Sequence, residues 1–244
     1  RLMELVDYVE PAAEMDTWET LAAGMPVLAR IHAALQHMPA GPAARQPLFA
    51  NYIEPAQALP RTLLGASRIR SWNPSQSERD LADEAEKLAR RVSSAECGME
   101  DRLPRQLVHG DFWDNNVYLR GGRVVYVADF DFMGIRSRID DIALTLFFAC
   151  MEYFEECASD TQLARLRALL DAYDLGADRP LSAAERAALP AAIARQPLWS
   201  IGGWVASLDD EGAARAHAAG TAAEVQWANR LMDELERWQS AFTG

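Results

Sequence analysis

The stretch LVHGDFWDNNVYLRGGRVVYVADFDFMG, residues 107–134, decides how the rest of this 244-residue chain is interpreted. The pair Gly121-Gly122 separates two apolar runs, and such a turn predicts a tight β-hairpin. If the glycines form the loop, paired positions sum to 243 and Asn116 lies across from Val127. Side chains alternate along a strand, so Asp129 shares a face with Val127 and becomes a diagonal neighbour of Asn116, with Cβ atoms roughly 7–8 Å apart. The hairpin therefore predicts an amide and a carboxylate that can share one cation.

The ligand types in this stretch favour a particular ion. Amide and carboxylate oxygens without histidine or thiol are hard ligands, which suit Mg²⁺ with water and phosphate in its other positions. Asp111 lies five residues before Asn116, at the loop end of the same strand, where it is placed to accept a proton from a substrate hydroxyl. Taken alone, Asp111 is also a common turn residue. Together the residues supply the base, metal amide and metal carboxylate that phosphoryl transfer requires.

Three segments together resemble a known family. HGDFWDNN resembles the H-G-D-x-x-x-x-N catalytic loop of the aminoglycoside and choline phosphotransferase family, kinases of small molecules that share the protein-kinase fold. VADFDFMG is similar to the metal-binding segment of that family, and DDIA to its D-L-A helix start. The resemblance implies that Asp111 is the catalytic base, that Asn116 and Asp129 bind Mg²⁺, and that ATP or GTP is the phosphoryl donor. It also implies that His109 and Asp141 brace the catalytic loop.

The resemblance covers the order of elements from residue 1 to about residue 155. It implies an α+β, protein-kinase-like fold in which residues 11–244 form a mostly helical C-terminal lobe around the catalytic hairpin. The opening segment LMELVDYVEP resembles the last strand of the small lobe running into the hinge, where backbone groups of Asp7, Tyr8 and Val9 would bind adenine. An edge strand of any other sheet is the alternative interpretation. Residues 1–10 are therefore expected to end a small lobe.

Two parts of such a kinase are missing from the chain. A glycine-rich turn over the phosphates and a strand lysine that pairs with them are both required. No glycine pair follows that pattern, and the single lysine, Lys87, lies on the charged face of a predicted helix. Most of the N-terminal β lobe is therefore expected to be absent from this chain, which should be catalytically silent in isolation.

Helical patterns fill the rest of the chain. Apolar residues recur at three and four positions in residues 15–35, where His32 is expected to serve in packing. Ser75 with Glu78, and Ser182 with Glu185, form capping boxes that start helices. Residues 39–74 contain six prolines and are expected to form a surface excursion with at most short helical pieces. Further helices are expected from Asp140 or Asp141, from a cap at Asp160 to about residue 172, and over residues 211–242.

Composition narrows the class of partners. The formal charge of −12, from 36 acids and 24 bases, argues against a sequence-independent nucleic-acid binder, which needs a basic face. Three cysteines without a C-x-x-C pair fit a reducing cytoplasm. The longest apolar run, residues 142–151, is too short to cross a bilayer, so no membrane association is expected. The oligomeric state is not indicated.

The acidic balance favours a cationic acceptor. Candidate acids for the acceptor side, each of which is also explained as an exposed acid or helix cap, are Asp114, Asp131, Asp209, Asp210 and Glu211. Trp199 and Trp204 suggest a cation-binding aromatic cage, although tryptophan in a helical segment more often packs in the core.

The sequence therefore predicts an ATP-dependent O-phosphotransferase that acts on a hydroxyl of a small, aminoglycoside-like molecule. Homoserine, choline and sugars are alternative acceptors. A catalytically inactive, kinase-like binding module is the alternative from another class of protein.

Overall fold

The structure is a computed structural model that describes residues 13–38, 50–99, 102–153 and 158–244. The predicted strand at residues 2–9, with the hinge residues Asp7, Tyr8 and Val9, lies outside the described residues. The described elements, in chain order, are α1 (Trp18–Leu35), α2 (Pro55–Ser71), α3 (Gln76–Glu96), β1 (Arg105–Val108), η2 (Asp114–Asn116), β2 (Val117–Arg120), β3 (Arg123–Val127), η3 (Phe130–Phe132), β4 (Gly134–Ser137), α4 (Arg138–Tyr153), α5 (Asp160–Gly176), α6 (Ala183–Arg195), η4 (Ser200–Val205), α7 (Glu211–Asp233) and α8 (Leu235–Thr243). The expected mostly helical body with a hairpin set into it is confirmed.

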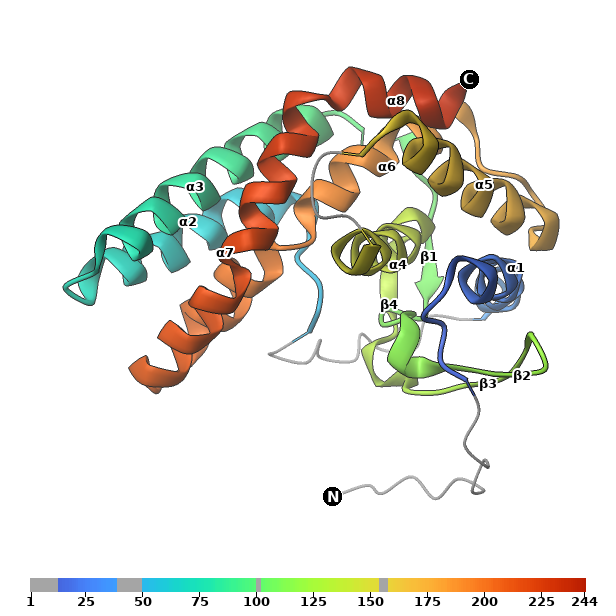
Figure 1. Ribbon diagram of the computed structural model, residues 1–244, viewed down its shortest axis with the longest axis horizontal. Helices are drawn as coiled ribbons and strands as arrows, with labels where there is room; N and C mark the ends of the chain where they lie inside the picture. Colours follow the sequence, from blue (N-terminus) through green and yellow to red (C-terminus); the bar gives the residue numbers. More distant parts are fainter. Residues whose placement is uncertain (1–12, 39–49, 100–101, 154–157) are drawn as a thin grey trace.

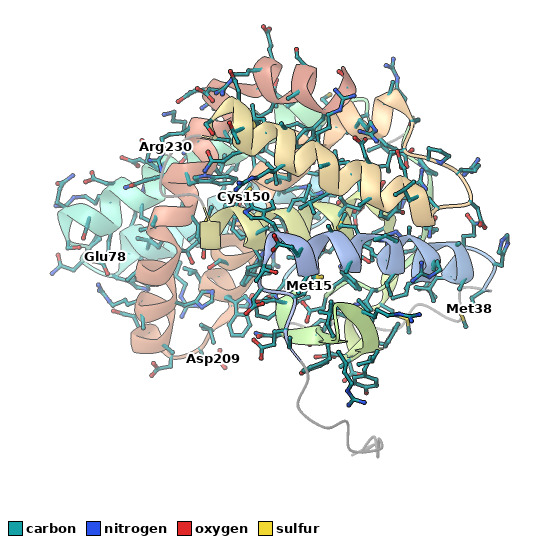
Figure 2. All side chains as sticks on the ribbon, turned by 45° about the vertical axis from the view of Figure 1, so that its right-hand side comes forward. Met15, Met38, Glu78, Cys150, Asp209 and Arg230 are labelled. Atoms are coloured by element: carbon teal, nitrogen blue, oxygen red, sulfur yellow. The ribbon has the colours of Figure 1, made fainter. Side chains whose placement is uncertain are left out.

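Helix α4 lies at the centre of the fold (Figure 1). Its side chains are buried on several faces, among them Ile142, Phe147 and Cys150, which is labelled near the middle of Figure 2. Helix α6 packs on α4, and α1 packs on α5, while α2, α3, η4 and α7 pack against one another. Figure 1 shows α2, α3 and α7 extending to one side of α4 and the β2–β3 hairpin to the other. The loop around His109 and Gly110 therefore lies beside the first turn of a buried central helix.

Capping side chains start two helices as the sequence predicts, α3 and α6. The hydroxyl of Ser75 accepts a hydrogen bond from the N–H of Glu78, and that of Ser182 accepts one from the N–H of Glu185. In each pair the glutamate carboxylate in turn accepts a hydrogen bond from the backbone N–H of the serine. These two capping boxes are confirmed. The expected cap at Asp160 is wrong by one residue, because Ser159 caps α5 and Asp160 is its first helical residue. The prediction of a single final helix is also wrong. The helix is interrupted at Glu234, where φ is −110° and ψ is 22°, and two helices, α7 and α8, result.

The expectation of at most short helical pieces in residues 39–74 is wrong for α2. Pro55 occupies the first turn, where its missing N–H costs nothing, whereas Pro60 lies inside the helix and costs about 3 kcal/mol. Packing outweighs this cost, because α2 lies closely against α3 and η4. A Cβ atom on Gly65 would come within 2.2 Å of the carbonyl oxygen of Ile201. Burial of a helix face by tertiary contacts thus overrides the local breaker signals.

Two small antiparallel sheets carry the catalytic segment: β1 pairs with β4, and β2 pairs with β3 around the Gly121-Gly122 turn. The predicted register holds at the turn, where Arg120 pairs with Arg123. It shifts by one beyond Leu119, because Val125 forms a bulge, and Val117 pairs with Val127. The predicted pairing of Asn116 with Val127 is therefore wrong; the Asn116 carbonyl instead accepts a hydrogen bond from the N–H of Ala128 at 2.8 Å.

Candidate active site

The loop after β1 turns sharply at Gly110. Its φ of +86° is a conformation that side chains disfavour. A Cβ atom at this position would also come within 2.1 Å of the carbonyl oxygen of Phe132. Glycine is therefore required between His109 and Asp111, and its absence of a side chain lets the loop lie directly against the segment that follows β3.

Asp141, in the first turn of α4, holds this loop by its backbone. The carboxylate is 1% exposed and accepts hydrogen bonds from the N–H of His109 at 2.9 Å and the N–H of Gly110 at 2.8 Å. Burial alone would raise the pKa of Asp141, but the hydrogen bond from His32 and the charge of Arg136 outweigh it and hold the pKa below its ordinary value. The loop is thus fixed by a buried carboxylate that stays ionised.

His32 completes the coordination of Asp141 from α1. Its Nε2 lies 3.0 Å from Asp141 Oδ2, and its Nδ1 lies 2.8 Å from the hydroxyl of Tyr173 on α5. The carboxylate only accepts, so Nε2 donates to it, and Nδ1 shares a hydrogen bond with the Tyr173 hydroxyl. The prediction that His32 serves in packing is therefore incomplete, because the ring also makes two buried hydrogen bonds. A histidine in an apolar helix stripe signals a buried polar partner, but the sequence does not show which one.

His109 lies in the loop with a defined tautomer. Nε2 faces the carbonyl oxygen of Ala128 at 3.0 Å and must donate, while Nδ1 accepts the N–H of Asp111 at 3.2 Å. The ring also contacts Phe130, with centroids 4.4 Å apart. Burial lowers the pKa of His109, although the charge of Asp141 opposes this shift. A neutral His109 therefore connects the catalytic loop with the segment after β3.

The Asp111 carboxylate lies in the middle of these contacts, with a residue exposure of 5%. Oδ2 accepts from Asn116 Nδ2 at 2.8 Å, and Oδ1 accepts from Asn51 Nδ2 at 3.2 Å. Burial raises the pKa of Asp111, and the two amides offset only part of that shift, to which the charge of Asp129 adds. A raised pKa makes this carboxylate a better proton acceptor. Asn51 was missed by the sequence analysis.

Asn116 and Asp129 fit an ion that prefers oxygen. Asn116 donates through Nδ2 to the carbonyl and carboxylate of Asp111, and among the described residues no hydrogen bond reaches its Oδ1. Asp129 is exposed in a left-handed conformation with φ 58°, and its Oδ1 accepts a hydrogen bond from the N–H of Asp131 at 3.4 Å. Asn116 belongs to η2 and Asp129 precedes η3, so both residues lie in turns just outside the paired strands β2 and β3.

Hard oxygen atoms suit Mg²⁺, which keeps several non-protein ligands. Within the described ranges, no group of three or more His, Cys, Asp and Glu side chains gathers as an alternative metal site. Asn116 Oδ1 and the Asp129 carboxylate are protein oxygens that could hold such an ion.

Two buried arginines support the site and were also missed. Arg136 on β4 is 1% exposed; it donates to the carbonyl of Phe132 at 3.1 Å, and its guanidinium lies 3.7 Å from the ring centroid of Tyr52. Arg195 at the end of α6 binds Asp140 at 2.5 Å and also pairs with Glu96. No local pattern marks these arginines, because Tyr52, Glu96 and Asp140, which they contact, are distant from them in sequence.

The five acids predicted for the acceptor side are not brought together by the described contacts. Asp210 caps α7, Glu211 pairs with Arg215 at 2.9 Å, and the exposed Asp209 lies at the edge of the molecule beside the start of α7 (Figure 2). Asp131 is exposed next to Asp129, and Asp114 is half-buried in η2, where burial raises its pKa. Their proposed role stays a prediction.

The two tryptophans suggested as an aromatic cage, Trp199 and Trp204, pack against a histidine of α7. Trp204 stacks on His217 of α7 with ring centroids 4.9 Å apart, and Trp199 lies 6.0 Å from the same ring. Trp113, next to Asp111, stacks on Phe148 at 4.5 Å. The Trp113–Phe148 stack therefore places apolar rings beside the loop that carries Asp111. Among the described helices, none is long and apolar enough to span a membrane.

The chain is similar in sequence to known proteins. The sequence model of the family described as "Phosphotransferase enzyme family" (APH) matches residues 3–181. A homoserine kinase of Rhodopseudomonas palustris is 34% identical over 131 residues, which are 53% of this chain and 36% of that protein. The chain spans about a third of the length of such curated relatives.

Solved structures agree on the fold. An aminoglycoside phosphotransferase from Alicyclobacillus acidocaldarius superposes with a TM-score of 0.62 at 16% identity, over 95% of this chain and 70% of that one. The amicoumacin kinase hAmiN, solved with AMP-PNP, Ca²⁺ and Ami, gives a TM-score of 0.56 at 16% identity, over 94% and 63%. The protein-kinase-like fold of a small-molecule kinase lobe is thereby confirmed.

Proposed function

The chain belongs to the phosphotransferase enzyme family, and from this membership we propose that the protein transfers the γ-phosphoryl group of ATP or GTP to a hydroxyl of a small molecule. The observation that carries the proposal is the Asp111 carboxylate, which is buried, held by amides on both oxygens, and given a raised pKa beside Asp129. A positioned carboxylate with a raised pKa is the expected base for a substrate hydroxyl.

Each residue has a distinct part in this reaction. Asp111 accepts the hydroxyl proton as the acceptor oxygen attacks the γ-phosphorus in line, and the nucleoside diphosphate leaves. Asn116 and Asp129 hold Mg²⁺, which when bound neutralises charge on the phosphates. Asp141 and His109 keep the loop in place, so the base stays at a fixed distance from the phosphates. The hinge at Asp7, Tyr8 and Val9, within a small lobe that ends at residues 1–10, remains the proposed adenine site.

The acceptor that the relatives favour is a hydroxylated amino acid. Proteins that match by sequence are named homoserine kinases, at 34% identity in one case, whereas the aminoglycoside phosphotransferase agrees in fold at 16% identity. We therefore place homoserine before the aminoglycoside-like, choline-like and sugar acceptors. A catalytically inactive binding module remains the alternative, and the retained Asp111, Asn116 and Asp129 count against it.

The test uses the protein with its complete natural sequence, labelled ATP, Mg²⁺ and a panel of L-homoserine, choline, an aminoglycoside and a hexose. We expect phosphorylation of at least one acceptor, and a fall in kcat on Asp111→Asn of roughly 10²- to 10⁴-fold, the usual contribution of a general base. Asp178→Asn, which changes an exposed acid in the connection between α5 and α6, serves as the matched control.

Either of two results would count against the proposal. If Asp111→Asn turned over near the wild-type rate, Asp111 would not be the base that accepts the hydroxyl proton. Nucleotide binding without transfer to any acceptor would favour the binding module.

A further inference from the structure

The segment between α1 and α2 reaches the catalytic base. Asn51 Nδ2 donates to Asp111 Oδ1 at 3.2 Å, while Asn116 Nδ2 donates to Oδ2 at 2.8 Å. Each oxygen of the carboxylate thus holds one amide, and the two amides together oppose rotation of the group about its Cβ–Cγ bond. Asn116 lies five residues from Asp111, but Asn51 lies sixty residues away, so the orientation of the base depends on a distant part of the chain.

This segment is itself anchored on buried cations. The ring of Tyr52 lies beneath the guanidinium of Arg136, 3.7 Å from its central carbon, and the carbonyl of Ile53 accepts from Arg195 Nη1 at 2.6 Å. Both arginines are 1% exposed. Since the residues directly after Asn51 are tied to the core beneath the catalytic loop, the Asn51 amide is held at a fixed place relative to Asp111.

The Asn51 side chain has no role in starting the adjacent helix. The N-cap of α2 is Glu54, and no side-chain hydrogen bond caps that helix. Among the described residues, the hydrogen-bond partner of the half-buried Asn51 side chain is Asp111 alone. A polar side chain whose described hydrogen bond goes to the proposed base is better explained by the orientation of that base than by the folding of its own segment.

The same segment also touches η4. A Cβ atom on Gly202 would lie 2.8 Å from Ile53 Cδ1, so Ile53 packs directly against η4, which lies between α6 and α7 in the chain and contacts both α2 and α7. We propose that Asn51 is a positioning residue, which aims the Asp111 carboxylate at the acceptor hydroxyl and couples that aim to the helical group of α2, η4 and α7. The proposal rests on the proposed function, because it assumes that Asp111 is the base.

Two substitutions in the protein with its complete natural sequence test this role. Asn51→Ala removes the amide, and Asn51→Asp keeps its size and an acceptor oxygen but removes the donor and adds a like charge beside Asp111. We expect kcat to fall roughly 10- to 100-fold in both, as part of a general base's contribution is lost, with the Asp variant at least as slow as the Ala variant. The KM values for nucleotide and acceptor should stay within about twofold, because a misaimed base affects the chemical step.

Two readings separate positioning from a structural role. The melting temperature of Asn51→Ala should fall by about 3–12 °C, since one hydrogen bond to a carboxylate is lost, so kcat is compared at a temperature where both proteins are folded. Gln57→Ala is the matched control: it removes an exposed amide near the start of α2, six residues after Asn51, and its kcat should stay within about twofold of the wild type.

Several outcomes would overturn the proposal. These are a wild-type kcat in Asn51→Ala, a wild-type kcat in Asn51→Asp, or a rise in acceptor KM at unchanged kcat, which would make Asn51 an acceptor-binding residue. A wild-type protein that phosphorylates no acceptor would overturn this inference and the proposed function together, whereas an active wild type with an unaffected Asn51→Ala would overturn this inference alone.

Discussion

Replacing Asp141 by asparagine removes one charge from the centre of the site and tests how the catalytic loop is held. The carboxylate is 1% exposed and accepts hydrogen bonds from the N–H of His109 at 2.9 Å, the N–H of Gly110 at 2.8 Å and His32 Nε2 at 3.0 Å. An asparagine has a single acceptor oxygen, so its NH₂ group would face at least one of these donors. Each bond to a charged group contributes about 1.5–3 kcal/mol, and an orphaned buried N–H costs about 1–3 kcal/mol.

These losses are partly recovered by relaxation, and we expect a net loss of about 3–5 kcal/mol, the usual result when one partner of a buried charge pair is removed. At about 2–4 °C per kcal/mol for a chain of this size, the melting temperature should fall by about 6–20 °C. Urea unfolding followed by circular dichroism at pH 7 gives the free energy of unfolding, with Asp178→Asn as the matched control at an exposed acid. Because the loop carries Asp111, kcat should fall by roughly tenfold or more.

The reasoning fails if Asp141→Asn unfolds within about 1 kcal/mol of the control. It also fails if the variant is destabilised as expected while kcat stays at the wild-type value, since the loop would then keep its geometry without the carboxylate.

Three further outcomes follow from the same contacts. Gly110→Ala should destabilise the protein by at least about 3 kcal/mol in urea unfolding, because a Cβ atom would come within 2.1 Å of the Phe132 carbonyl oxygen at a φ of +86°. Tyr173→Phe should cost about 1 kcal/mol, since it removes the 2.8 Å bond to His32 Nδ1. The pKa of Asp141 is depressed on folding. The stability that its carboxylate contributes is therefore fully present above the ordinary carboxyl pKa and is lost as the pH falls through the lower folded pKa. Thermal melts at decreasing pH below 5 should show a shallower loss of stability in Asp141→Asn than in the wild type.

Local features of the fold could be read from the sequence because the interacting residues are neighbours in the chain. The capping boxes at Ser75 and Ser182 each involve residues three apart, and the Gly121-Gly122 turn needs only its own two glycines. The register beyond Leu119 could not be read, since the bulge at Val125 adds one residue without a residue type that marks it. Helix α2 was missed because its stability comes from contacts with α3 and η4 and not from its own composition.

The same distinction applies to the site. Asp111 and Asn116 are five residues apart and lie within one motif, so their contact at 2.8 Å was accessible to sequence reasoning, although the strand-pairing argument used for Asn116 was wrong. Asn51 and His32 lie 60 and 109 residues from their partners, Asp111 and Asp141. Such contacts depend on how whole helices pack, and a single sequence does not specify which polar residues meet.

The distribution of buried charge explains why these distant contacts converge on one place. Asp140 and Asp141 begin the central helix α4; Asp141 binds the loop and His32, while Asp140 binds Arg195 of α6 at 2.5 Å. Buried ion pairs add little net stability compared with apolar packing, but a mispaired one costs about 3–5 kcal/mol. The pairs therefore penalise any packing in which α1, α4 and α6 shift relative to one another. Apolar residues at these positions would keep the helices together, but they would not fix the angle at which the loop presents Asp111, and a shift of about 1 Å at a catalytic group is enough to reduce turnover by roughly 10²-fold.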